Sequence, residues 1–133
     1  MSWQTYVDQN LMCAVDADGN TLQSAALVGL DGGVWAQSPE FPALTSEEAL
    51  KMIGILNDPD SNTGSFTMGG VKYMVLMSED PETKLRGKCQ GGGCAVNKTA
   101  TCVVVGIWKE PVPASACNRV VEALGDYLKD NNY

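Results

Sequence analysis

Apolar residues recur at helical spacing near both ends of the chain. The first stripe consists of Trp3, Tyr6, Val7 and Leu11. It predicts a helix from Ser2 to about Cys13, with Ser2 as the N-cap. The second stripe consists of Cys117, Val120, Val121, Leu124, Tyr127 and Leu128. It predicts a helix from Ala114 to about Lys129, entered after two prolines.

A third helix is predicted by its capping residues. Thr45 is followed three residues later by Glu48, the reciprocal capping pattern that opens many helices. The apolar positions that follow place this helix at Ser46 to about Leu56. The turn-forming residues from Asn57 to Gly64 then predict an exposed loop.

Short β-branched runs fill the rest of the chain. The predicted strands are 22–30, 34–37, 65–68, 71–78, 83–89, 94–98 and 101–108. Gly-rich turns at 31–33, 69–70 and 90–93 join neighbouring strands, so the sheet should be antiparallel. The run 101–108 is apolar on both faces and should be the central strand.

These elements predict an α+β fold in a single domain, residues 1–133. We expect a central antiparallel sheet of five to seven strands. The N- and C-terminal helices should pack side by side on one face, with a short helix on the other. The 44% hydrophobic content is enough for one core.

Charge and composition exclude several classes of function. A net charge of −7 argues against general affinity for nucleic acid. We expect no membrane span and no leader segment. The five cysteines are too few for a small domain built on disulfides, and they fit a reducing compartment. A cytoplasmic location is therefore predicted. The sequence has no His, which removes Ser-His and Cys-His hydrolysis and His-ligated metal catalysis. We expect no metal, no cofactor and no enzymatic activity.

Three patterns that resemble chemical sites have simpler interpretations. Gly91–Gly93 lacks the Lys-Ser/Thr of a phosphate-binding loop and fits a hairpin turn. Cys89 and Cys94 flank that turn; they could form a disulfide if their geometry allows it. The acidic pairs at 47–48 and at 58 and 60 lie at a helix start and in a turn, where acids are common.

The basic residues carry more information. Lys84, Arg86 and Lys88 alternate along one predicted strand, so their side chains should project from one face of the sheet. Three like charges in this arrangement repel one another in the absence of a partner. An anionic partner is therefore favoured.

The aromatic residues allow two interpretations. Trp3, Tyr6, Trp35, Tyr127 and Tyr133 could simply belong to the core, the default for such side chains. If the terminal helices lie side by side, the same residues could line a surface groove. Aromatic grooves of this kind bind polyproline II segments, which are extended before they bind.

Five segments together resemble the profilin family, in the style of its plant, algal and amoeboid members. They are residues 1–7 (MSWQTYV), 30–36 (LDGGVWA), 69–75 (GGVKYMV), 86–88 (RGK) and 118–128 (NRVVEALGDYL). They occur in the family's order, and the resemblance covers essentially the whole chain. Asn97-Lys98, where many plant-type relatives carry two Lys, and the cysteines at 89 and 94 depart from the pattern.

The resemblance implies a protein, mainly monomeric, that binds monomeric actin, regulates its polymerisation in the cytoskeleton and is modulated by phosphoinositides. It also implies binding to proline-rich ligands such as those of formins. The implied proline-binding residues are Trp3, Tyr6, Trp35, Tyr127 and Tyr133. The implied actin-binding residues are Lys72, Lys84, Arg86, Lys88, Asn97, Asn118 and Glu122, with Lys84, Arg86 and Lys88 shared by phosphoinositides. The alternative from the residues alone is a cytosolic sensor domain that holds a small ligand in an internal cavity.

Overall fold

The computed structural model describes residues 2–61, 64–76 and 78–133, and in this part of the chain seven strands form one antiparallel sheet. The strands are β1 (Ser24–Gly29), β2 (Val34–Gln37), β3 (Ser65–Met68), β4 (Val71–Leu76), β5 (Lys84–Cys89), β6 (Gly92–Lys98) and β7 (Cys102–Lys109). Their order across the sheet is β2-β1-β7-β6-β5-β4-β3. The predicted sheet is confirmed, with the highest of the expected strand numbers.

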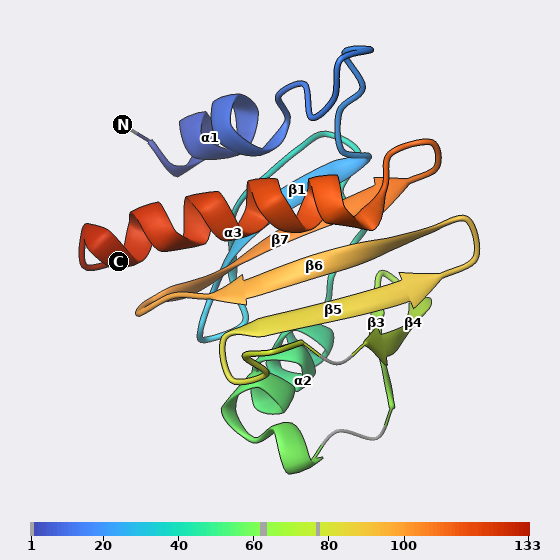
Figure 1. The fold of residues 1–133 in the computed structure, drawn as a ribbon. Helices are drawn as coiled ribbons and strands as arrows, with labels where there is room; N and C mark the ends of the chain where they lie inside the picture. Colours follow the sequence, from blue (N-terminus) through green and yellow to red (C-terminus); the bar gives the residue numbers. More distant parts are fainter. Residues whose placement is uncertain (1, 62–63, 77) are drawn as a thin grey trace.

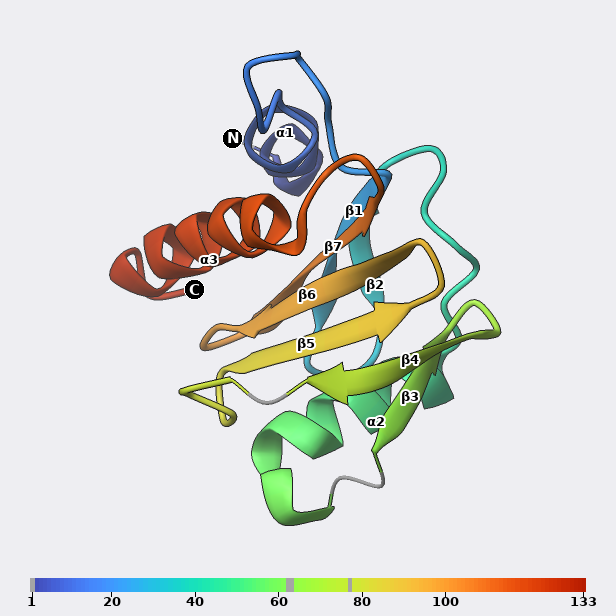
Figure 2. The ribbon, with the colours of Figure 1, turned by 45° about the vertical axis from the view of Figure 1, so that its right-hand side comes forward.

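The helices lie on opposite faces of this sheet. The chain begins with one turn of α-helix, α1 (Trp3–Tyr6), which continues as a π-helical segment, η1 (Val7–Leu11). These two elements lie beside the C-terminal helix α3 (Ala114–Asp130) on one face, and α2 (Ser46–Asn57) covers the other (Figures 1 and 2). This is the predicted arrangement of the terminal helices. No helix among the described residues is both long and apolar enough to cross a membrane.

Some details differ from the sequence prediction. β6 begins at Gly92, two residues earlier than predicted, because the turn needs only Gln90 and Gly91. β6, and not β7, is the middle strand of the seven, although β7 is also interior. A short 3₁₀ turn, η2 (Pro59–Ser61), forms within the predicted loop. Residues 62–63 of the predicted loop, residue 77 of the predicted strand 71–78, and residue 1 lie outside the described residues.

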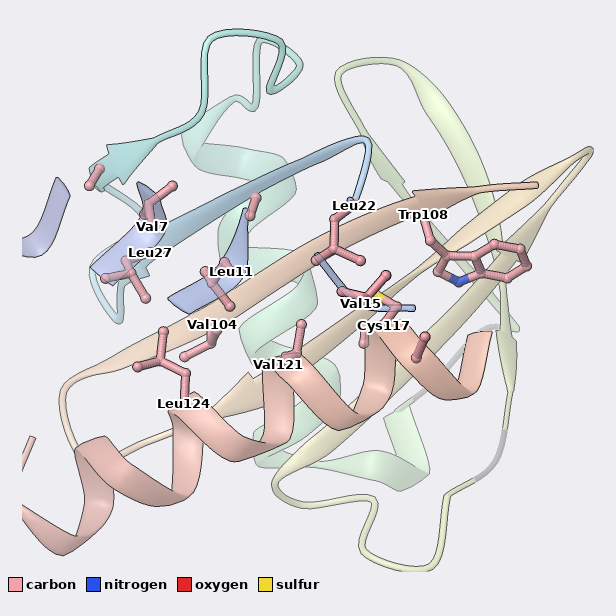
Figure 3. Close-up of a cluster of buried hydrophobic side chains, with 14 of the residues drawn as sticks. Val7, Leu11, Val15, Leu22, Leu27, Val104, Trp108, Cys117, Val121 and Leu124 are labelled. Atoms are coloured by element: carbon pink, nitrogen blue, oxygen red, sulfur yellow. The ribbon is translucent and has the colours of Figure 1, made fainter. Parts of the chain in front are cut away.

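Two hydrophobic cores hold these layers together. Between the terminal helices and the sheet, Leu11, Val121 and Leu124 pack against side chains of β1 and β7 such as Leu27 and Val104 (Figure 3). On the other face, α2 contributes Met52 and Leu56 to a second core that includes Phe66. Every residue of β1 is buried, because both faces of this strand are covered.

One part of the sheet is left uncovered on the α3 side. α3 packs on β6 and β7 and leaves exposed the side chains of β4 on this face and Lys88 of β5. On β4, Met74 pairs with Lys88 and Leu76 pairs with Arg86, so these side chains share one face. Met74 and Leu76 are exposed by 54% and 44%.

Candidate functional site

Five aromatic side chains, far apart in sequence, form one continuous cluster, which we call the aromatic groove: Trp3, Tyr6, Trp35, Tyr127 and Tyr133. The ring of Trp3 is central, with its centroid 4.8 Å from that of Trp35, 5.1 Å from Tyr133 and 5.8 Å from Tyr6. Tyr6 in turn lies 6.0 Å from Tyr127 on α3. All five residues named from the sequence are therefore brought together.

Local interactions fix the N-terminal part of the groove. The Ser2 hydroxyl accepts a hydrogen bond from the Thr5 amide and caps α1, as predicted. The Gln4 side chain donates to the main-chain oxygen of Gln37 at 3.0 Å and ties α1 to β2. Trp35 lies across Gly29 of β1; a Cβ atom at that position would come within 2.6 Å of the indole nitrogen. The glycine therefore makes the space in which Trp35 can reach Trp3.

Tyr133 is held by the turn between β6 and β7. Its main-chain oxygen accepts hydrogen bonds from the Thr101 amide at 2.6 Å, the Thr101 hydroxyl at 2.7 Å and the Thr99 hydroxyl at 2.9 Å. Its amide donates to Leu128 at 2.8 Å. Asn132 turns the chain with a positive φ of 68°. These contacts fold the last residues back so that the ring of Tyr133 meets Trp3.

The groove combines packed and exposed rings. Trp3 and Tyr6 are partly buried against the core, whereas Trp35, Tyr127 and Tyr133 are exposed by 38%, 48% and 44%. Partial desolvation, and after it the interaction with Tyr127, raises the pKa of Tyr6. A tyrosine hydroxyl is protonated at neutral pH and can donate a hydrogen bond. Flat apolar surface next to hydroxyl donors can bind an extended apolar segment that carries free carbonyl groups.

A second surface lies on the uncovered part of the sheet, and we call it the basic face: Lys72, Lys84, Arg86 and Lys88. Arg86 and Lys88 point toward the α3 side, as their alternation predicts. Arg86 forms an ion pair with Glu122 of α3 at 2.6 Å, and the Lys88 ammonium lies 4.5 Å from the centroid of the Trp108 ring. Lys72 is exposed on β4. Arg86 and Lys88 thus already interact with neighbouring side chains, whereas Lys72 is exposed to a partner.

Two apolar residues of this surface were missed from the sequence. Met74 and Leu76 lie on the same face of β4 as Lys72 and are exposed between the basic residues. The signal was present, because Lys72, Met74 and Leu76 alternate along one strand. Exposed apolar side chains among charges are typical of protein interfaces.

Of the remaining implied actin-binding residues, one is placed elsewhere. Asn118 and Glu122 lie half-buried on α3, one helical turn apart, and Glu122 reaches Arg86. Asn97, in contrast, has no exposed surface. Its side chain lies beneath α3 against Gly125 and offers nothing to a partner in this conformation. The prediction that Asn97 belongs to the binding surface is therefore wrong for this structure, because α3 covers that part of β6.

Comparisons with known proteins match the chain to one family and to several solved structures. The profilin family model matches residues 1–133. The solved structure of Acanthamoeba castellanii profilin IB is similar with a TM-score of 0.86 and 34% identity, covering 99% of this chain and 100% of that one. Mouse profilin IIa in complex with a double repeat from the FH1 domain of mDia1 is similar with a TM-score of 0.70 and 26% identity, covering 100% of both chains. LokiProfilin1, solved in a complex with rabbit actin, shares the fold with a TM-score of 0.67 and 18% identity over 83% of this chain and 84% of that one.

Proposed function

Since the chain belongs to the profilin family over its whole length, we propose that it binds monomeric actin and proline-rich ligands at two separate surfaces and so regulates actin polymerisation. The observation that carries the proposal is the aromatic groove, in which rings from both ends of the chain and from β2 form one continuous surface. In this proposal the protein acts as an adaptor in the cytoplasm and not as an enzyme.

The chemistry of the aromatic groove suits a polyproline II ligand. Such a ligand has few backbone donors, exposes its carbonyl groups and loses little entropy when it binds. The exposed rings of Trp35, Tyr127 and Tyr133 supply flat apolar surface, and the tyrosine hydroxyls and the indole N–H groups supply donors. The mouse relative, solved with an FH1 repeat, supports the same class of ligand here, a formin proline-rich segment.

The basic face suits an acidic protein surface, which we assign to actin. Lys72, Lys84 and Lys88 supply charge, and Met74 and Leu76 supply apolar area between them. Asn118 and Glu122 extend this face onto α3. Burial of apolar side chains at the centre of such a surface raises the affinity for a partner, and the surrounding charges raise the association rate.

We also propose that phosphoinositide head groups compete for Lys84, Arg86 and Lys88. The three residues lie on one strand and on the face proposed for actin, so the two ligands would exclude each other. Arg86 is paired with Glu122, and an anionic head group would have to replace that carboxylate. This requirement favours weak binding.

A small-ligand sensor would need an enclosed chamber. In the described part of the chain, packed side chains occupy both layers between the helices and the sheet. The two surface sites therefore explain the structure better.

Substitution of the central ring tests the two-site proposal. Trp3→Ala should abolish retention on poly-L-proline resin, because Trp3 contacts three of the other four rings. It should leave actin-monomer binding nearly unchanged. Leu50→Ala, which removes an exposed apolar side chain from α2 on the other face of the sheet, is the matched control and should retain both activities.

The proposal fails if folded Trp3→Ala still binds the resin as well as the unmodified chain does. Loss of both activities in a variant with an unchanged circular dichroism spectrum would contradict the separation of the two sites.

A further inference from the structure

The aromatic groove continues beyond Tyr127 as a hollow between η1 and α3. The hollow has a volume of about 260 Å³. It is lined by Asn10, Arg119, Val120, Ala123, Leu124 and Tyr127. Tyr127 belongs to both the groove and the hollow, so the hollow adjoins the groove at this residue.

The positions of the lining residues give their order along the surface, starting from Tyr127. On α3, Tyr127, Ala123 and Arg119 follow one another at intervals of four residues and so share one side of the helix. On the neighbouring segment, Asn10 lies about one helical turn after Tyr6. A ligand that leaves the ring pair of Tyr6 and Tyr127 in this direction therefore meets Ala123 and then Arg119.

Among the described residues that line the hollow, Arg119 is the one that carries a charge. One of its terminal nitrogens donates to the main-chain oxygen of Val15 at 2.8 Å, which holds the side chain beside the hollow. A guanidinium group carries five N–H donors, so one such bond leaves donors available. Carboxylates are the side chains that a guanidinium binds best.

We propose that this hollow binds the segment next to the prolines of the ligand, and that Arg119 pairs with an acidic side chain of that segment. The inference rests on the proposed function of the aromatic groove. It adds a preference among proline-rich ligands, namely for those with Asp or Glu beside the proline run.

The geometry also predicts where the acidic residue should lie. Tyr127 and Arg119 are eight residues apart on α3, or about 12 Å along the helix axis. A polyproline II segment rises about 3.1 Å per residue, so this distance corresponds to about four ligand residues. The acidic side chain should therefore lie about four residues from the proline that packs on Tyr127, on either side of it in the ligand chain.

Binding of synthetic peptides to the full chain tests this inference, with affinity measured by calorimetry. Each peptide carries a decaproline run and a Gly-Ser flank. The flank is either neutral or carries one Asp, placed about four (near) or about ten (far) residues from the nearest proline. The set is made with the flank at either end of the run. The near Asp should raise affinity about two- to fivefold over the neutral flank at one end or both, as is typical of exposed ion pairs.

Two variants assign this gain to Arg119. Arg119→Gln keeps a donor toward Val15 but loses the charge, and it should bind the near-Asp and neutral peptides equally well. Lys109→Gln removes the same charge from an exposed residue at the end of β7 and should keep the gain.

The inference is overturned if the near Asp gives no gain at either end, if the far Asp gives the same gain, or if the gain persists in Arg119→Gln. In each of these cases, binding of the neutral peptide still measures the affinity of the aromatic groove for proline. If the neutral peptide does not bind at all, the proposed function itself fails.

Discussion

The carboxylate of Glu48 joins the start of α2 to the turn between β3 and β4. It accepts a hydrogen bond from the Thr45 amide at 3.0 Å, which completes the capping box predicted from the sequence. It also accepts bonds from the amides of Gly69 and Gly70, both at 3.1 Å, in the turn between β3 and β4. The sequence predicted the cap; the contact with the turn required the fold, because it joins residues more than 20 positions apart.

These bonds predict a pH dependence of stability. Burial alone would raise the pKa of Glu48, but hydrogen bonds from Thr45, the Gly69-Gly70 turn and Thr67 outweigh it and lower the pKa from 4.5 to about 2. Because the pKa is lower in the folded state, the ionised carboxylate stabilises the fold above pH 4.5, and this contribution is lost as the pH falls from 4.5 toward 2. Glu48→Gln should lower the free energy of unfolding at neutral pH by about 1 to 2 kcal/mol.

Urea unfolding at a series of pH values measures both effects. The Glu48→Gln variant should show a shallower loss of stability between pH 4.5 and 2 than the unmodified chain. Glu47→Gln, a change at the exposed neighbouring residue, should keep the full slope. Equal slopes in all three proteins would contradict the assignment to Glu48.

At the level of secondary structure, α3 takes part in both proposed sites. Glu122 reaches the basic face, and Tyr127 reaches the aromatic groove. Between them, Gly125 lies directly over Asn97 of β6, and a Cβ atom on Gly125 would come within 2.7 Å of the Asn97 Cγ atom. The close approach of helix and sheet at this point depends on the absence of a side chain at Gly125.

A double-mutant cycle tests this contact. Gly125→Ala should lower the free energy of unfolding by about 1 to 3 kcal/mol, because Asn97 is fully buried and cannot move aside without disturbing the core. In the Asn97→Ala background the same change should be neutral or stabilising, since the clash is gone and Ala favours a helix by about 0.5 to 1 kcal/mol.

Gly54→Ala on α2 is the control for helix propensity alone. No atom lies within 4 Å of a Cβ atom placed there, so this change should stabilise the protein. If Gly125→Ala has the same effect in both backgrounds, Asn97 is not the reason for the glycine.

The helices and strands were predictable where the chain follows a simple period. β2, β3 and the start of α3 lie where the sequence placed them, because the alternation of apolar residues, turn glycines and prolines leaves few options. The π-helical form of η1 and the early start of β6 were not predictable. Both depend on contacts with distant strands and helices, which local spacing does not contain.

At the level of the whole molecule, the two sites differed in how far the sequence could define them. The shared face of Arg86 and Lys88 followed from the period of a strand. The meeting of Trp3, Trp35 and Tyr133 needed the packing of three elements far apart in sequence. The residues alone left a shared groove as one of two interpretations, and the family resemblance favoured it. Burial of Asn97 was equally invisible, because its neighbour Gly125 lies 28 residues away.

The distribution of charge over the molecule predicts how actin binding should depend on salt. The net charge of −7 opposes an acidic partner, so the basic face must supply attraction that is local and is screened over about 10 Å at 0.1 M salt. Lys88→Glu should therefore weaken actin-monomer binding about tenfold at low salt and less at higher salt. Lys51→Glu, on α2 behind the sheet, changes the net charge by the same amount and should have little effect.

A titration of fluorescently labelled actin monomers at several salt concentrations compares the two variants. Equal weakening by both would mean that net charge governs the association, and an effect of Lys88→Glu that did not change with salt would mean that the basic face acts by shape and not by charge.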